Sequence, residues 1–158
     1  MAGVLYIEHE RIPLCEIANA LTAADHKVFV AYDPYTAQRA TKNHGPQIDL
    51  VIMDVLFKHG LPEDVDCMPN DVIRAFETGD SKWRPIIALS ARTEHYRERE
   101  KLRSTNPNVI LSVDKVMTQI PRLLRVIDFV NVWVHTPGNE LPSEPQMQTL
   151  MGAVDAIP

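Results

Sequence analysis

The chain has 158 residues, of which 45% are apolar and 23% are charged, and this balance excludes a fully disordered protein. Sixteen basic and 21 acidic residues give a formal net charge of −5, which argues against direct nucleic-acid binding across the whole domain. Cys15 and Cys67 cannot form a disulfide framework and match no zinc motif, so the simplest prediction is a cytoplasmic protein. The first apolar run is short and is followed by Glu8 and Glu10, which predicts neither a signal peptide nor a membrane span.

Five short apolar runs recur along the chain, and each is rich in Val, Ile or Leu. Near-continuous apolar strands of this kind are typical of a parallel sheet that is covered on both faces. The runs occupy residues 3–7, 27–31, 49–54, 85–90 and 108–113.

Helical patterns occupy the intervals between these runs. Asp33 followed by Pro34 is a helix start signal, and Gly45 followed by Pro46 ends the same helix. The alternation predicts an α/β protein with an open, doubly wound (βα)₅ sheet. The expected helices span residues 13–24, 34–44, 70–78, 94–104 and 118–135.

The last segment differs in composition, because four of the twelve prolines lie after residue 136. We therefore predict a folded domain over residues 1–135 and a flexible, proline-rich tail over residues 136–158. A short segment around residues 147–154 could dock on the domain.

Polar side chains follow several of the predicted strands. In open α/β sheets, functional groups lie beyond the carboxyl ends of the strands. Glu8, Asp54, Ser90 and Lys115 occupy such positions, after the first, third, fourth and fifth strands. Carboxylates suit Mg²⁺, and a lysine and a hydroxyl contact phosphate oxygens, so this set predicts a site for a hard cation and a phosphoryl group.

The segments VLYIEHE, DLVIMDV, PIIALSA and VDKV, in this order, make residues 3–135 resemble a receiver domain of two-component response regulators, of the chemotaxis-regulator type. The resemblance implies a flavodoxin-like fold with a five-stranded parallel sheet of order 2-1-3-4-5. It implies that Asp54 accepts a phosphoryl group from a histidine kinase or phosphotransfer protein, and that Ser90 and Lys115 contact this group. It also implies that Glu8, Asp54 and the backbone carbonyl of Leu56 hold Mg²⁺.

Four positions depart from the family pattern. His9 stands where the family usually has a second metal-ligating acid, and imidazole is a poor ligand for Mg²⁺. The loop after Asp54 is longer than usual and lacks an early proline, Val116 replaces the proline after the lysine, and Ser112 replaces an aromatic residue. We therefore expect weak Mg²⁺ binding, with His9 either facing away or pairing with Glu8 or Asp54.

Three functions follow as hypotheses. The first is a receiver that catalyses only its own phosphorylation and dephosphorylation and signals by binding a downstream protein. The alternative is a pseudo-receiver that keeps the fold, is not phosphorylated, and acts as an adaptor or dimerisation module. The apolar end of the last predicted helix, around Trp133, suggests a contact with either a second copy of the chain, as a homodimer, or another partner. A third hypothesis is a cobalamin-type small-molecule module, but its D-x-H-x-x-G signature is not met by residues 54–60.

Overall fold

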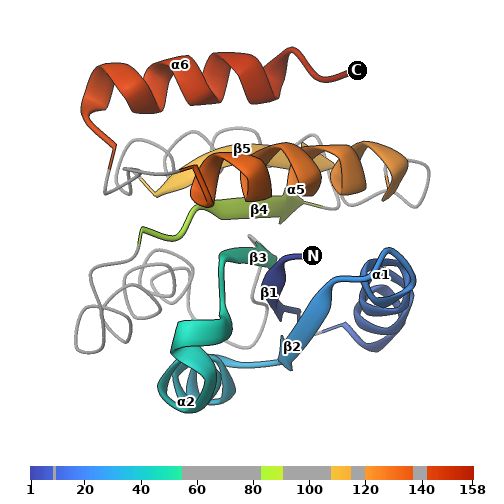
Figure 1. Cartoon of the computed structure of the whole chain (residues 1–158). Coiled ribbons are helices and arrows are strands. Elements are labelled where there is room, and N and C mark those ends of the chain that lie inside the picture. The colour runs from blue at the N-terminus through green and yellow to red at the C-terminus, as the bar shows by residue number, and fades with distance from the viewer. Residues whose placement is uncertain (9, 55–82, 91–107, 115–119, 137–141) are drawn as a thin grey trace.

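The computed structural model describes residues 1–8, 10–54, 83–90, 108–114, 120–136 and 142–158. Their core is one parallel five-stranded sheet of order β2-β1-β3-β4-β5 (Figure 1). The predicted fold class and strand order are therefore confirmed, and each strand begins and ends within one residue of the predicted run. The strands are β1 (Gly3–Ile7), β2 (Lys27–Ala31), β3 (Leu50–Asp54), β4 (Ile86–Ser90) and β5 (Val109–Asp114).

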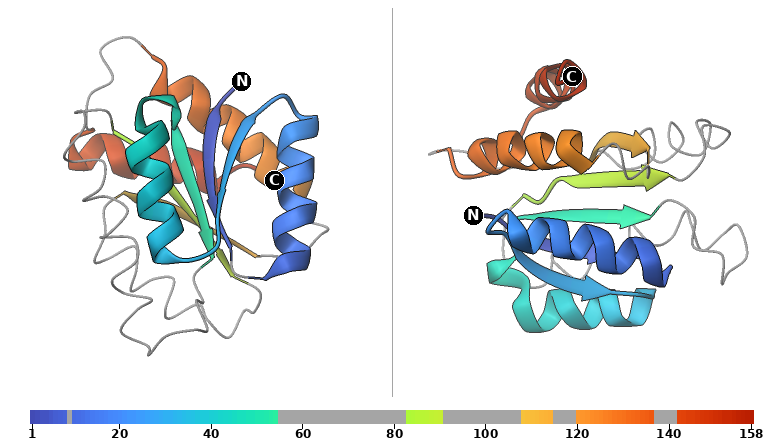
Figure 2. Two further views of the ribbon diagram at one scale, coloured as in Figure 1. Left: turned by 90° about the horizontal axis from the view of Figure 1, so that it is seen from below. Right: turned by 90° about the vertical axis from the view of Figure 1, so that its right-hand side faces the viewer.

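Helices cover both faces of this sheet (Figure 2). Alternate side chains of each strand point to opposite faces, so two separate apolar clusters form. Val4 and Tyr6 pack with residues of α1 and α5, whereas Leu5 and Ile7 pack on the face covered by α2. The predicted helices at 70–78 and 94–104 lie outside the described residues. The described ones are α1 (Arg11–Ala23), α2 (Pro34–His44), the 3₁₀ turn η1 (Gly45–Gln47), α5 (Ile120–Val134) and α6 (Glu144–Asp155).

A close backbone approach fixes the start of β1 beside η1. A Cβ atom on Gly3 would lie 1.7 Å from the carbonyl oxygen of Gln47, so only glycine fits there. The Gly3 amide donates to Asp49 Oδ2 at 2.8 Å. From the other side, the buried Arg84 donates to the carbonyl oxygens of Gly45 and Ile48, both at 2.8 Å. These contacts set the register of the strands whose opposite ends carry the acidic residues.

The prediction of a flexible tail is wrong for residues 144–155, which form α6. Ser143 begins the helix with a capping box to Gln146. Met147, Leu150 and Val154 recur at helical spacing and are buried in the cluster that contains α5, as the predicted docking of 147–154 requires. Proline near the start of a helix is compatible with it, so the composition of this segment did not prevent a helix.

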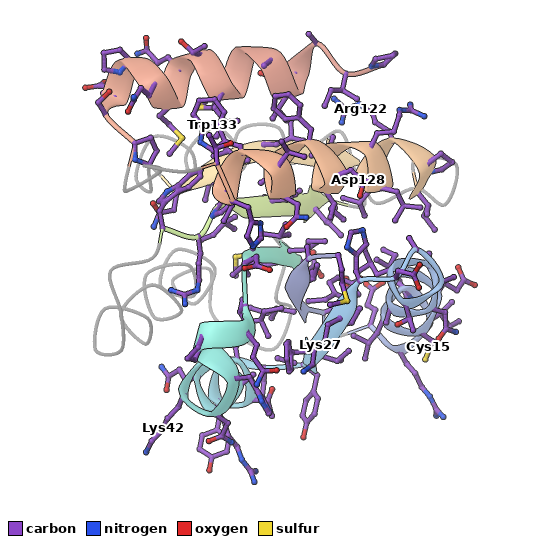
Figure 3. All side chains as sticks on the ribbon, in the orientation of Figure 1. Cys15, Lys27, Lys42, Arg122, Asp128 and Trp133 are labelled. Atoms are coloured by element: carbon purple, nitrogen blue, oxygen red, sulfur yellow. The ribbon has the colours of Figure 1, made fainter. Side chains whose placement is uncertain are left out.

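α6 lies on the β5 side of the sheet, opposite β2, and contacts β5 and α5. Arg122 of α5 donates from Nε to the Ile157 carbonyl oxygen at 3.1 Å, and Arg125 donates to the Pro158 carbonyl oxygen. Figure 3 shows Arg122 near the end of α6. α6 and the residues that follow it are thus anchored by apolar burial and by backbone contacts.

The apolar end of α5 is only partly a surface feature. Trp133 and Val134 pack against the core cluster, and Figure 3 shows Trp133 between α5 and α6. Val132 and Phe129 are the exposed apolar residues there. Trp133 is therefore only partly exposed, beside the exposed Val132, and an interface at this end of α5 stays a prediction. Within the described helices, none combines the length and apolar character needed to cross a membrane.

Candidate functional site

Glu8 and Asp54 lie next to each other at the carboxyl ends of adjacent strands. Ile7 of β1 is in register with Met53 of β3, and the two acids are the next residues along their strands. They also share a face, because Glu8 is two residues beyond Tyr6, and Asp54 is two beyond Ile52, in the cluster under α1 and α5. The two acids lie at the topological switch point of the sheet, because β2 pairs with one edge of β1 and the next strand in sequence, β3, pairs with the other.

Both carboxylates are withdrawn from water: Glu8 is 0% exposed and Asp54 is 4% exposed. Burying a carboxylate is costly unless hydrogen-bond donors surround it. For Glu8, the Glu10 amide donates to Oε1 at 3.0 Å and the Tyr6 hydroxyl donates to Oε2 at 3.3 Å. The Glu8 amide donates to the Ala31 carbonyl oxygen at 2.9 Å, which holds the end of β1 against β2.

The Tyr6 hydroxyl, beside these carboxylates, is uncharged. Burial raises the pKa of its hydroxyl far above the ordinary value, and the charge of Glu8, its hydrogen bond to Glu8, and the charges of Asp54 and Glu10 raise it further. All three carboxylates therefore act on the same phenol. We refer to Tyr6, Glu8, Glu10 and Asp54 together as the acidic site.

The structure brings together two of the predicted site residues, Glu8 and Asp54. Ser90 ends β4, the strand paired with β3, but its side chain lies outside the described part. His9, Leu56 and Lys115 fall outside the described residues, so their roles stay predictions.

Tyr6 was not among the sequence-predicted site residues, because an aromatic residue in an apolar strand suits a core position. A signal was nevertheless present. A tyrosine two residues before a strand-end acid shares its face, and its hydroxyl needs a partner once it is buried.

The chemistry of the described donors suits a hard cation. Glu8 and Asp54 are oxygen ligands, the kind that Mg²⁺ prefers. Both Glu8 oxygens also accept hydrogen bonds, from the Tyr6 hydroxyl and the Glu10 amide. Across the described residues, no three His, Cys, Asp or Glu side chains converge as a metal-binding group. The described carboxylates, Glu8 and Asp54, are therefore oxygen ligands of the type that Mg²⁺ prefers, and they supply only part of its coordination.

No family model and no curated protein matches the sequence. Among solved structures, a response regulator receiver protein from Sinorhizobium medicae has a TM-score of 0.63 at 19% identity, covering 85% of this chain and 97% of that chain.

Two further matches are similar. The N-terminal domain of a response regulator/sensory box/GGDEF protein from Carboxydothermus hydrogenoformans has a TM-score of 0.60 at 23% identity, over 82% of this chain and 93% of that chain. A fusion of the yeast Spc42 trimeric coiled coil to another protein has a TM-score of 0.68 at 19% identity, over 98% of this chain and 92% of that chain. With its strand order and its acids at the switch point, the chain has the fold of a response-regulator receiver domain.

Proposed function

We propose that this chain is a receiver module that accepts a phosphoryl group on Asp54 from a histidine kinase or phosphotransfer protein and then binds a downstream protein. The observation that carries the proposal is the position of Asp54. It ends the strand beside β1 at the switch point, it is almost buried, and it lies next to Glu8. The similarity to receiver structures supports the same function.

The chemistry requires a weak nucleophile to attack an anionic group. An Asp54 carboxylate oxygen would attack phosphorus as the bond from phosphorus to the donor's imidazole nitrogen breaks, and that nitrogen leaves with a proton from solvent. Two buried carboxylates repel the incoming group, so the reaction depends on neutralising charge from fixed positions. Mg²⁺ bound by Asp54, with Glu8 beside it, would supply that neutralisation. Ser90 and Lys115 are proposed to contact the transferred group.

A second function, a pseudo-receiver adaptor, is favoured by the partners of Glu8. Its two oxygens are engaged by Tyr6 and by the Glu10 amide, and the next residue is His9 rather than an acid. If the site holds no cation, Asp54 keeps its charge and is not phosphorylated. The domain would then act through its surface alone.

Incubation with acetyl phosphate and Mg²⁺, followed by intact mass spectrometry, separates the two functions. We expect the wild-type chain to gain the mass of one phosphoryl group and Asp54→Asn to gain none. Asp128→Asn is the matched control, because Asp128 is an exposed carboxylate on α5. Labelling that persists in Asp54→Asn contradicts the assignment of Asp54. An unlabelled wild-type chain supports the adaptor.

A further inference from the structure

The Tyr6 hydroxyl lies between two acceptors that belong to different parts of the fold. Glu8 Oε2, at the end of β1, is 3.3 Å away, and the carbonyl oxygen of Pro13, in the first turn of α1, is 3.5 Å away. A phenol has a single proton, so the two acceptors compete for it. Both distances exceed the usual O–H···O range of about 2.5–3.0 Å, so a small tilt of the C–O–H group decides between the acceptors.

The rest of Tyr6 is held in place. The residue is fully buried, in the same apolar cluster as Ile17 and Leu21 of α1. Close packing around the ring disfavours a change of rotamer. The direction of the hydroxyl proton is therefore the freedom that remains to this side chain.

The charge on Glu8 determines which acceptor is preferred. A hydrogen bond to an ionised carboxylate is roughly twice as strong as one to a neutral acceptor, so the anionic Glu8 attracts the proton. When a bound cation neutralises part of that charge, Glu8 becomes a weaker hydrogen-bond acceptor relative to the Pro13 carbonyl. The proton then moves towards α1.

We propose that Tyr6 couples the acidic site to the first turn of α1, by passing its hydrogen bond from Glu8 to the Pro13 carbonyl oxygen when the charge of Glu8 is neutralised. This inference deepens the proposed function, on which it rests for the cation that occupies the site. It assigns to Tyr6 the part of a positioning residue and identifies α1 as an element that responds to occupancy of the site.

A second contact supports the same direction of coupling. Glu10 is the residue that precedes the first turn of α1, and its amide donates to Glu8 Oε1. Glu8 thus holds the start of α1 twice, directly through the Glu10 amide and indirectly through Tyr6. A change of charge on this one carboxylate alters both connections together.

The test uses NMR spectroscopy on the full chain, labelled with ¹³C and ¹⁵N, and follows the Pro13 carbonyl carbon and the Glu10 amide. Glu8→Gln removes the charge without any ligand, so we expect its Pro13 carbonyl signal to move in the same direction as that of the wild type on adding MgCl₂. In Tyr6→Phe and in the double variant, the Pro13 signal should not respond. Glu16→Gln, which removes an exposed charge from α1, is the matched control and should leave Pro13 unchanged.

Two results would overturn the coupling. One is a Pro13 signal that is unaffected by Glu8→Gln, and the other is a response of equal size in the Tyr6→Phe background. Failure of the proposed function gives a different pattern. In that case MgCl₂ produces no shift around Asp54 in the wild type, while the comparison of Glu8→Gln with the double variant still decides whether Tyr6 connects the site to α1.

Discussion

Replacing Tyr6 with phenylalanine should make the protein less sensitive to alkali. Burial and the neighbouring charge of Glu8 raise the pKa of the Tyr6 hydroxyl in the folded chain, whereas in the unfolded chain this pKa is near its ordinary value of about 10. The folded state therefore keeps a proton that the unfolded state releases. The stability that this proton provides is complete below about pH 10 and is lost progressively as the pH rises above that value.

The size of the effect follows from this linkage. One retained proton lowers the free energy of unfolding by about 1.36 kcal/mol for each pH unit above the unfolded pKa. Between pH 9 and pH 11.5, the wild-type chain should lose about 2 kcal/mol through Tyr6 alone. Tyr6→Phe has no proton to lose at this position. Over the same pH range, its free energy of unfolding should therefore fall by about 2 kcal/mol less than that of the wild type.

Urea denaturation followed by circular dichroism at several pH values from 8 to 11.5 measures the difference. The comparison uses slopes, because the lost hydrogen bond to Glu8 lowers the stability of the variant at every pH. Tyr32→Phe and Tyr35→Phe are the controls, since both tyrosines are exposed, and these variants should follow the wild type. Equal slopes for the wild type and Tyr6→Phe would refute a buried, protonated Tyr6 beside Glu8.

Three further changes test the fold through the same denaturation measurement. Gly3→Ala places a Cβ atom against the Gln47 carbonyl and should cost about 2 kcal/mol or more, whereas an unchanged midpoint would mean that β1 and η1 are farther apart. Leu150→Ala empties a fully buried position of α6 and should cost about 2–5 kcal/mol, and a negligible loss would show that α6 does not pack on the domain. Asp25 has a φ of 64°, so Asp25→Gly should add roughly 0.5 kcal/mol, and a loss of stability would contradict that backbone conformation.

The sheet was predictable because parallel strands have a strong local signature. Each strand is a short apolar run bounded by polar residues. Because both faces are buried, apolar and polar residues do not alternate within the run, so the ends of the strand are clear. α6 was missed for a compositional reason, since prolines were given more weight than local signals. Ser143 and Gln146 form a capping pair, and Pro145 lies in the first turn, where its missing amide costs little.

The candidate site was predictable only as far as topology determines it. Glu8 and Asp54 were identified because parallel strands end at one edge of the sheet and β1 lies beside β3. The role of Tyr6 depends on distances of a few ångströms and on complete burial of the side chain, and neither can be read from a local sequence pattern. The connection from Glu8 to α1 needs the helix to be placed before it can be recognised.

The position of α6 also limits how copies of this chain can add to one another. β2 is the last strand on its side, and Val30 on it is 43% exposed, whereas α6 occupies the β5 side. A sheet with two open margins can recruit a neighbour at each and grow into an unlimited array. Here a strand from another molecule meets a helix at one margin, and the backbone groups of a helix are already satisfied internally. In the described part of the fold, α6 therefore disfavours strand addition at the β5 side and leaves β2 as the margin where a further strand could pair.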